Sequence, residues 1–494
     1  MQQFTQESST ANNNTQQAGK TSYLLVAGVS LLAVLAAVSL YSLHALGFEP
    51  PTAMLLFVLG SVVASAGAYL VVATKNIHGR FTMDNALGGI QRSHTVPVPR
   101  IGGVAVVLGF AAISIADGFA SFDLPAAVHS EFTQLLAGLL LCAIPAALSG
   151  FIEDVTKKVS VKVRLFATIA SGLIASAWLG ATIPHFNVWG LDSLMTIPLF
   201  AALATAFCAG GVANAVNIID GFNGLASGAL VVMAAGFALL GVSLNDPIVV
   251  LLALSVASVA AGFMVVNYPS GRVFLGDGGA YLLGFMLAEL AIVTAARHPE
   301  LNAFTVLTLI AYPVLEVAVS VVRRRMAKMS PGDPDRGHMH QQVQEAIRHT
   351  LGRVADRETL NRVRRHVPSI NPQVSPVVWV IVALMVATGL SLSTAGAVAT
   401  LGFVVCAALY LGIYRTVVAY NRQSSVQRGV LLTPALDIRP TPAQGVVMPV
   451  VGNSVRVTGR EEVSVAGVNE QGSTAPSKRA GSNPESTKGD KLSA

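Results

Sequence analysis

Residues 214–228 read Asn-Ala-Val-Asn-Ile-Ile-Asp-Gly-Phe-Asn-Gly-Leu-Ala-Ser-Gly, between two apolar segments long enough to cross a membrane. The stretch contains three asparagines and Asp220. A carboxylate and amides lose solvation energy beside apolar segments, so they need a metal ion, a polar ligand or water next to them. The stretch therefore predicts two membrane helices and a functional site at the surface where they meet.

Composition extends this prediction to the rest of the chain. The 494 residues are 53% hydrophobic and only 12% charged, and the mean hydropathy is +0.61. A soluble protein carries about 25% charged residues, so we expect a polytopic membrane protein. The 32 Lys and Arg exceed the 26 Asp and Glu, but they gather in loops between apolar runs. The positive-inside pattern explains this excess without a nucleic-acid partner.

Apolar runs near 20 residues in length predict an all-α fold with 11 or 12 transmembrane helices. The expected spans are 22–46, 53–73, 101–120, 134–152, 161–181, 194–213, 224–242, 247–266, 279–296, 302–322, 376–394 and 397–415. They form one domain over residues 22–415. Residues 1–21 are expected to be a polar tail, and residues 416–494 a largely disordered C-terminal tail.

The loops divide into two sets by charge. Lys and Arg concentrate in the loops at 74–100, 153–164 and 323–375, and the opposite loops contain almost none. We expect the basic set and both termini to be cytoplasmic. All of the polar clusters fall on the same side, which favours one composite site.

Two of these clusters combine basic and acidic side chains. Arg92, His94 and Arg100 are suited to binding a phosphate, and a basic membrane anchor is the alternative. Glu153 and Asp154 are adjacent carboxylates, which raise one another's pKa unless a cation is near. They suit Mg²⁺ binding or a general base, and a solvated helix end is the alternative.

The opening stretch forms the third cluster. Asn214, Asn217 and Asp220 follow one another at intervals of three, which places them along one face if the preceding span continues as a helix. They could line a ligand site, or the asparagines could pack between helices.

The fourth cluster lies immediately before another expected span. Asp277 is flanked by Gly276, Gly278 and Gly279, and a helix N-terminus there would favour phosphate while the carboxylate holds Mg²⁺. Phe274 could stack on a base or anchor the interface. Asn267 opens this cluster.

The fifth cluster contains Arg336, His338 and His340. Two histidines spaced by one residue could ligate zinc, but no second His or Cys pair supports this, so phosphate binding is the better interpretation. A solvated loop is the alternative. Together the five clusters supply the groups of a Mg²⁺-dependent phosphoryl-transfer site.

Residues 50–345 resemble the polyprenyl-phosphate N-acetylhexosamine-1-phosphate transferases, glycosyltransferase family 4. The Asn-x-x-Asn-x-x-Asp-Gly-x-x-Gly-Leu and Phe-Leu-Gly-Asp motifs carry the resemblance. It implies that a UDP-N-acetylhexosamine donates its sugar-1-phosphate to undecaprenyl phosphate, with release of UMP. This would be a phosphotransferase for substituted phosphate groups in the bacterial inner membrane, priming a surface polysaccharide such as O-antigen, lipopolysaccharide or cell wall.

The resemblance also implies roles for individual residues. It makes Glu153, Asp154 and Asp277 catalytic, with Asp277 and Asp154 as metal ligands for Mg²⁺, or Mn²⁺ as the alternative. The substrate-binding residues would be Arg92, His94, Arg100, Asn214, Asn217, Asp220, Asn267, Phe274, Arg336, His338 and His340. The implied partners are the two substrates, the lipid bilayer and a second copy of the chain in a homodimer.

Three positions depart from the family pattern: Glu153 stands in place of an aspartate, Gln341 in place of a histidine, and Glu316 in place of an aspartate. An inactive scaffold derived from the same fold is therefore one alternative. A membrane transporter is another, although its polar residues should lie near mid-membrane.

Overall fold

The computed structural model of the chain describes residues 2–48, 50–84, 97–119, 124–329, 337–354, 370–393 and 396–427. In this part of the chain, nine helices are long and apolar enough to cross a membrane, and two bent helix pairs raise the number to as many as 11. A further apolar helix, α4, is shorter. The expected all-α, polytopic membrane fold is confirmed.

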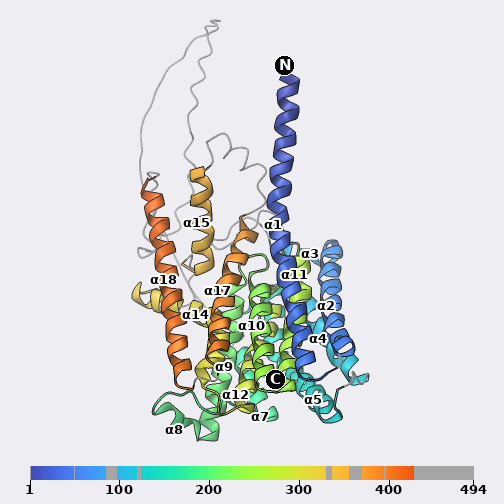
Figure 1. Cartoon of the computed structure of the whole chain (residues 1–494), viewed down its shortest axis with the longest axis vertical. Helices are drawn as coiled ribbons and strands as arrows, with labels where there is room; N and C mark the ends of the chain where they lie inside the picture. Colours follow the sequence, from blue (N-terminus) through green and yellow to red (C-terminus); the bar gives the residue numbers. More distant parts are fainter. Residues whose placement is uncertain are drawn as a thin grey trace, which may run out of the picture. The chain divides into compact units, whose positions relative to one another are not determined.

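The chain order of the elements is shown in Figure 1. The helices are α1 Gln2–Ala45, α2 Pro50–Ala73, α3 Lys75–Thr82, α4 Gly103–Phe119, α5 Ala126–Cys142, α6 Ile144–Thr156, α7 Val161–Leu179, α8 Leu191–Met195, α9 Pro198–Ile219, α10 Leu225–Ser243, α11 Pro247–Asn267, α12 Gly276–Arg297, α13 Ala303–Leu309, α14 Ala311–Met326, α15 Met339–Val354, α17 Asn371–Ser391 and α18 Val398–Gln427. Two short strands, β1 Met83–Asp84 and β2 Val98–Pro99, pair antiparallel.

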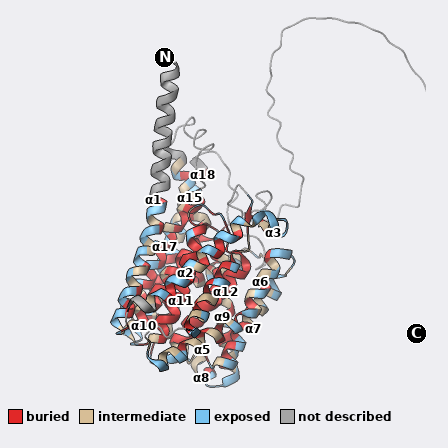
Figure 2. Cartoon of the chain, turned by 90° about the vertical axis from the view of Figure 1, so that its right-hand side faces the viewer, coloured by how far each residue is buried: buried red, intermediate tan, exposed pale blue. Residues whose placement is uncertain are grey.

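Helices α10, α11 and α12 form the interior of the bundle. Their apolar segments are 83%, 94% and 89% buried, whereas the corresponding segment of α7 is only 28% buried. Figure 2 shows this difference as a red interior with a blue and tan surface. Helix α12 contacts α6 and α9, and α11 contacts α2 and α10. Apolar side chains all around α11 and α12 therefore face protein, not lipid.

Two expected spans are broken in the structure. The span predicted at 134–152 consists of α5 and α6, which bend by 44° at Ala143, next to Pro145. The span predicted at 302–322 consists of α13 and α14, which bend by 88° near Pro313. Proline lacks a backbone N–H and favours the first turn of a new helix. These two predictions of continuous spans were therefore wrong.

Other boundaries also differ from the expected ones. Helix α1 starts at Gln2, so helical structure runs through the tail expected at 1–21. Helix α18 continues to Gln427, past the expected end of the last span at 415. Helix α15 was not predicted at all, because its sequence is amphipathic and polar rather than apolar. The rest of the C-terminal tail lies outside the described residues.

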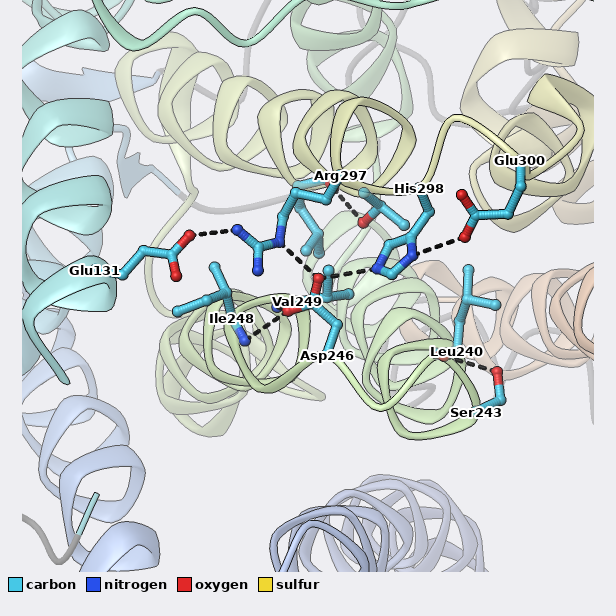
Figure 3. Close-up of polar contacts among 11 residues, drawn as sticks. Glu131, Leu240, Ser243, Asp246, Ile248, Val249, Arg297, His298 and Glu300 are labelled. Carbon is cyan, nitrogen blue, oxygen red and sulfur yellow. Dashed lines mark hydrogen bonds and ion pairs between the residues drawn. The ribbon is translucent and has the colours of Figure 1, made fainter. Parts of the chain in front are cut away.

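The bundle has two distinct ends, which we name the α15 end and the α8 end (Figure 1). At the α8 end, Arg297 at the end of α12 donates from Nε to Asp246 Oδ2 at 2.6 Å and from Nη1 to Glu131. His298 Nε2 contacts the same Asp246 oxygen at 2.9 Å, and its Nδ1 lies 3.0 Å from Glu300 Oε1. Figure 3 shows how these side chains join α5, α12 and the turn between α10 and α11.

Asp246 should be the residue on which the stability of this cluster depends. Its Oδ1 also caps α11, accepting from the Ile248 amide at 2.9 Å. Burial alone would raise the pKa of Asp246, but hydrogen bonds and charge from Arg297 and His298 lower it below its usual value. Because the folded-state pKa is depressed, this stabilisation is present above about pH 4 and is lost as the pH falls through the lowered pKa.

We expect Asp246→Asn to lower the unfolding free energy by about 2 kcal/mol at neutral pH, because it removes a buried acceptor of charged hydrogen bonds. Thermal unfolding in detergent would measure this. Glu300→Gln is the matched control, since the Glu300 side chain is 67% exposed and should change stability little. Equal effects of both substitutions would contradict the prediction.

Candidate active site

The central contact of the site joins the end of α6 to the start of α12. Asp154 Oδ1 accepts the Asp277 amide at 2.9 Å, and its Oδ2 accepts the Gly278 amide at 2.9 Å. The Asp154 side chain is completely buried. A carboxylate at a helix N-terminus satisfies amides that have no partner within the helix and interacts favourably with the helix dipole. Asp154 therefore fixes the position from which Asp277 projects.

Two arginines surround the Asp277 carboxylate. Arg164, from the first turn of α7, donates to Asp277 Oδ2. Arg100 places Nη2 3.5 Å from Asp277 Oδ1 and 3.6 Å from Asp154 Oδ1. The Arg100 side chain is 23% exposed, so this charge remains accessible to a ligand. The arrangement combines a carboxylate with guanidinium groups, which bind phosphate oxygens well.

Asp220 occupies the turn between α9 and α10, close to this group. Loss of solvation and the nearby Asp277 carboxylate raise the pKa of Asp220 to about 7, while Arg100 opposes the shift. The acids Asp154, Asp220 and Asp277 outnumber the two guanidinium groups. A cation is therefore compatible with the charge of the site when Asp154 and Asp220 are both ionised.

The three asparagines expected to line the site mainly hold its elements together. Asn214 Nδ2 donates to Thr168 Oγ1 on α7 at 2.8 Å and to a carbonyl of its own helix, which matches the helix-packing alternative. Asn217 Nδ2 donates to Tyr281 Oη on α12 at 3.0 Å. Asn267, which is buried, accepts the Gly224 amide and donates to the Val273 carbonyl. It thereby joins the α9–α10 turn to the loop before α12.

Phe274 lies in that loop and is half-buried. Its amide donates to the Pro99 carbonyl at 2.9 Å, and its own carbonyl accepts the Gly102 amide at 3.0 Å. These bonds connect it to β2. Arg92 and His94, which precede β2, and Arg336 lie outside the described residues.

His338 and His340, at the start of α15, form a second group beside the first. Their rings stack with centroids 5.4 Å apart, and His340 meets Phe222 edge-on at 5.4 Å. Burial lowers the pKa of His340 to about 4, so this ring is neutral at pH 7. Phe222 follows Asp220 by two residues, so the turn between α9 and α10 links the histidines to the carboxylates.

Glu153 interacts electrostatically with Arg164, the arginine that contacts Asp277. Its Oε2 accepts the Val159 amide at 2.7 Å and so closes the loop between α6 and α7. The expectation that it acts as a base stays a prediction.

Sequence reasoning missed several polar residues. Tyr281 and Tyr410 lie within apolar runs. Their hydroxyl groups are the only local feature of the sequence that indicates a polar contact. Glu289 is buried in the middle of α12, and neither of its carboxylate oxygens has a hydrogen-bond partner among the described residues. A single acidic residue within an apolar run indicates a functional site, and Glu289 could have been noted on that basis.

The chain is similar to several known proteins. Residues 136–295 match the model of glycosyl transferase family 4. The chain is 28% identical to decaprenyl-phosphate N-acetylglucosaminephosphotransferase of Mycobacterium tuberculosis, over 53% of this chain and 69% of the relative. It is 26% identical to undecaprenyl-phosphate alpha-N-acetylglucosaminyl 1-phosphate transferase of Yersinia pestis, over 52% and 68%.

A probable undecaprenyl-phosphate N-acetylglucosaminyl 1-phosphate transferase of Bacillus subtilis is 23% identical, over 51% of this chain and 67% of the relative. The fold defines a multi-pass membrane protein, and its candidate site combines carboxylates with guanidinium groups. The chain is similar to glycosyl transferase family 4, whose polyprenyl-phosphate N-acetylhexosamine-1-phosphate transferases its motifs also resemble.

Proposed function

We propose that the protein transfers N-acetylhexosamine-1-phosphate from a UDP-sugar to undecaprenyl phosphate, giving the lipid diphosphate sugar and UMP. The observation that carries this proposal is the Asp277 carboxylate, fixed by Asp154 and flanked by Arg100 and Arg164. The names of the relatives supply the polyprenyl-phosphate acceptor and the N-acetylglucosaminyl phosphate group. Priming of a surface polysaccharide on the cytoplasmic face of the inner membrane is part of the same proposal.

The barrier to this reaction is repulsion between two anions, because the acceptor phosphate approaches a diphosphate. Arg100 lies between Asp154 and Asp277 and can turn its exposed edge toward the phosphates. Arg164 holds one oxygen of Asp277 and so fixes the direction of the carboxylate. The reacting groups are thereby held in position with little reorganisation, which is the main contribution an enzyme makes to phosphoryl transfer.

The donor set fits Mg²⁺ bound together with substrate. No three His, Cys, Asp or Glu side chains in the described ranges converge as a metal site by themselves. Mg²⁺ characteristically takes one or two carboxylates and completes its shell with substrate phosphates and water. We propose Asp277 as the protein ligand, with Asp154 fixing its position instead of ligating the ion. When bound, Mg²⁺ would offset the charge on the diphosphate.

Release of UMP tests the proposed function. The purified full chain would be incubated with undecaprenyl phosphate and separate radiolabelled UDP-N-acetylhexosamines, with Mg²⁺, with Mn²⁺ and with EDTA. We expect a lipid-linked labelled sugar and UMP in equal amounts, only with a divalent cation. UMP without lipid product, or no product with any of these donors, would contradict the proposed reaction.

A further inference from the structure

Helix α18 reaches the candidate site although it lies beyond the residues that match the family model. Its Tyr410 is 1% exposed, and the Tyr410 hydroxyl donates to Glu316 Oε2 on α14 at 2.6 Å. Tyr312 packs edge-on against the Tyr410 ring, at 6.3 Å between centroids. A tyrosine hydroxyl directed at a buried carboxylate is a specific contact, because an apolar side chain there would leave the carboxylate short of a donor.

The other oxygen of Glu316 holds the start of α15. Glu316 Oε1 accepts the Met339 amide at 2.9 Å and lies 2.9 Å from His338 Nδ1. Because a carboxylate can only accept, the proton of this contact belongs to His338 Nδ1. Glu316 is 1% exposed, so water does not replace these contacts.

The contacts continue from His338 to the turn that carries Asp220. His338 stacks on His340 with an angle of 2° between the rings, and His340 contacts Phe222. His340 Nδ1 is buried and has no hydrogen-bond partner among the described residues. The orientation of both rings thus depends on Glu316, and the position of the Glu316 carboxylate depends on Tyr410.

We propose that Tyr410 is a positioning residue of the active site, which acts through Glu316 to fix the ring of His338 and the first turn of α15. The proposal rests on the transferase activity proposed above and extends the site to a helix outside the family-matched region. Tyr410 touches no substrate in this arrangement, so its effect should pass entirely through His338.

The test compares Tyr410→Phe with Tyr420→Phe in the full chain. Tyr420 is the matched control because it also joins α18 to α15, through a hydroxyl contact of 2.9 Å with Thr350, but it does not contact Glu316. Steady-state kinetics would separate kcat from KM. Hydrogen exchange of the peptide covering residues 337–345 would report the order of the α15 start independently of turnover.

We expect Tyr410→Phe to lower kcat about tenfold, or about 1.4 kcal/mol, as other residues that orient a site residue do. Exchange of the 337–345 peptide should be faster than in the parent protein. Tyr420→Phe should change neither quantity. In a His338→Asn background, Tyr410→Phe should cause no further fall in kcat, because the group through which it acts is already gone.

Unchanged kcat and unchanged exchange in Tyr410→Phe would overturn the proposal, and so would multiplicative losses in the double variant. If the parent protein forms no lipid-linked sugar, the proposed function fails. Hydrogen exchange then still tests whether Tyr410 orders the start of α15. Equal exchange rates of the 337–345 peptide in Tyr410→Phe and Tyr420→Phe would refute that role of Tyr410.

Discussion

Asp277→Asn is expected to reduce formation of the lipid-linked sugar by at least about a thousandfold. The substitution removes the charge of the proposed metal ligand and one of the two carboxylate oxygens that contact Arg100 and Arg164. Those arginines would then be free to bind the diphosphate in an unproductive position. The measurement is the initial rate of radiolabelled lipid product at saturating Mg²⁺.

The control for this prediction is a carboxylate at the other end of the molecule. Glu300→Gln changes an exposed acid at the α8 end and should keep the parent rate. Thermal unfolding of both variants would separate loss of chemistry from loss of fold. If Asp277→Asn retained more than about a tenth of the activity, Asp277 could not be the ligand on which phosphoryl transfer depends.

Gly276→Ala is expected to abolish activity almost as completely, through the backbone. Gly276 has φ of +74°, a conformation that L-residues with side chains rarely adopt. A Cβ atom there would also collide with the Arg100 carbonyl and lie 2.5 Å from Asp154 Oδ2. The substitution should therefore displace the start of α12, and we expect at least about a hundredfold loss of product formation.

Gly211→Ala provides the matched control, because a Cβ on this helical glycine of α9 would meet no atom within 4 Å. Alanine also favours a helix over glycine by about 1 kcal/mol. This variant should keep its activity and unfold at the same or a higher temperature. Comparable activity in the two variants would show that the start of α12 tolerates displacement.

Much of the fold could be predicted because a run of about 20 apolar residues is long enough to cross the hydrocarbon layer as a helix. The positions of α10, α11 and α12 follow closely from hydropathy, whereas α9 continues to Ile219, past its expected end at 213. The breaks at Ala143 and Ile310 were missed, since an average over 20 residues hides a bend caused by one proline. Helix α15 was missed for the opposite reason, because its amphipathic sequence has no long apolar run.

The site was only partly predictable from sequence. Asp154 contacts the start of α12 directly, and Asp220 interacts electrostatically with Asp277 and Arg100. The role of each carboxylate follows from its contacts, which the sequence does not give. Asp154 accepts from two backbone amides, whereas Asp277 contacts two arginines. Glu316 was noted only as a departure from a pattern. Its link to Tyr410 spans 94 residues of sequence, and local spacing cannot indicate such a contact.

Helix α12 is held at both ends by side chains of other helices, Asp154 at one end and the Asp246 cluster at the other. Its 22 residues measure about 33 Å along the axis, close to the thickness of the hydrocarbon layer. The length of α12 therefore sets the depth of Asp277 relative to the hydrocarbon layer. The phosphate of a membrane-dissolved lipid lies at that same boundary, so the proposed acceptor would meet the carboxylate without leaving the membrane.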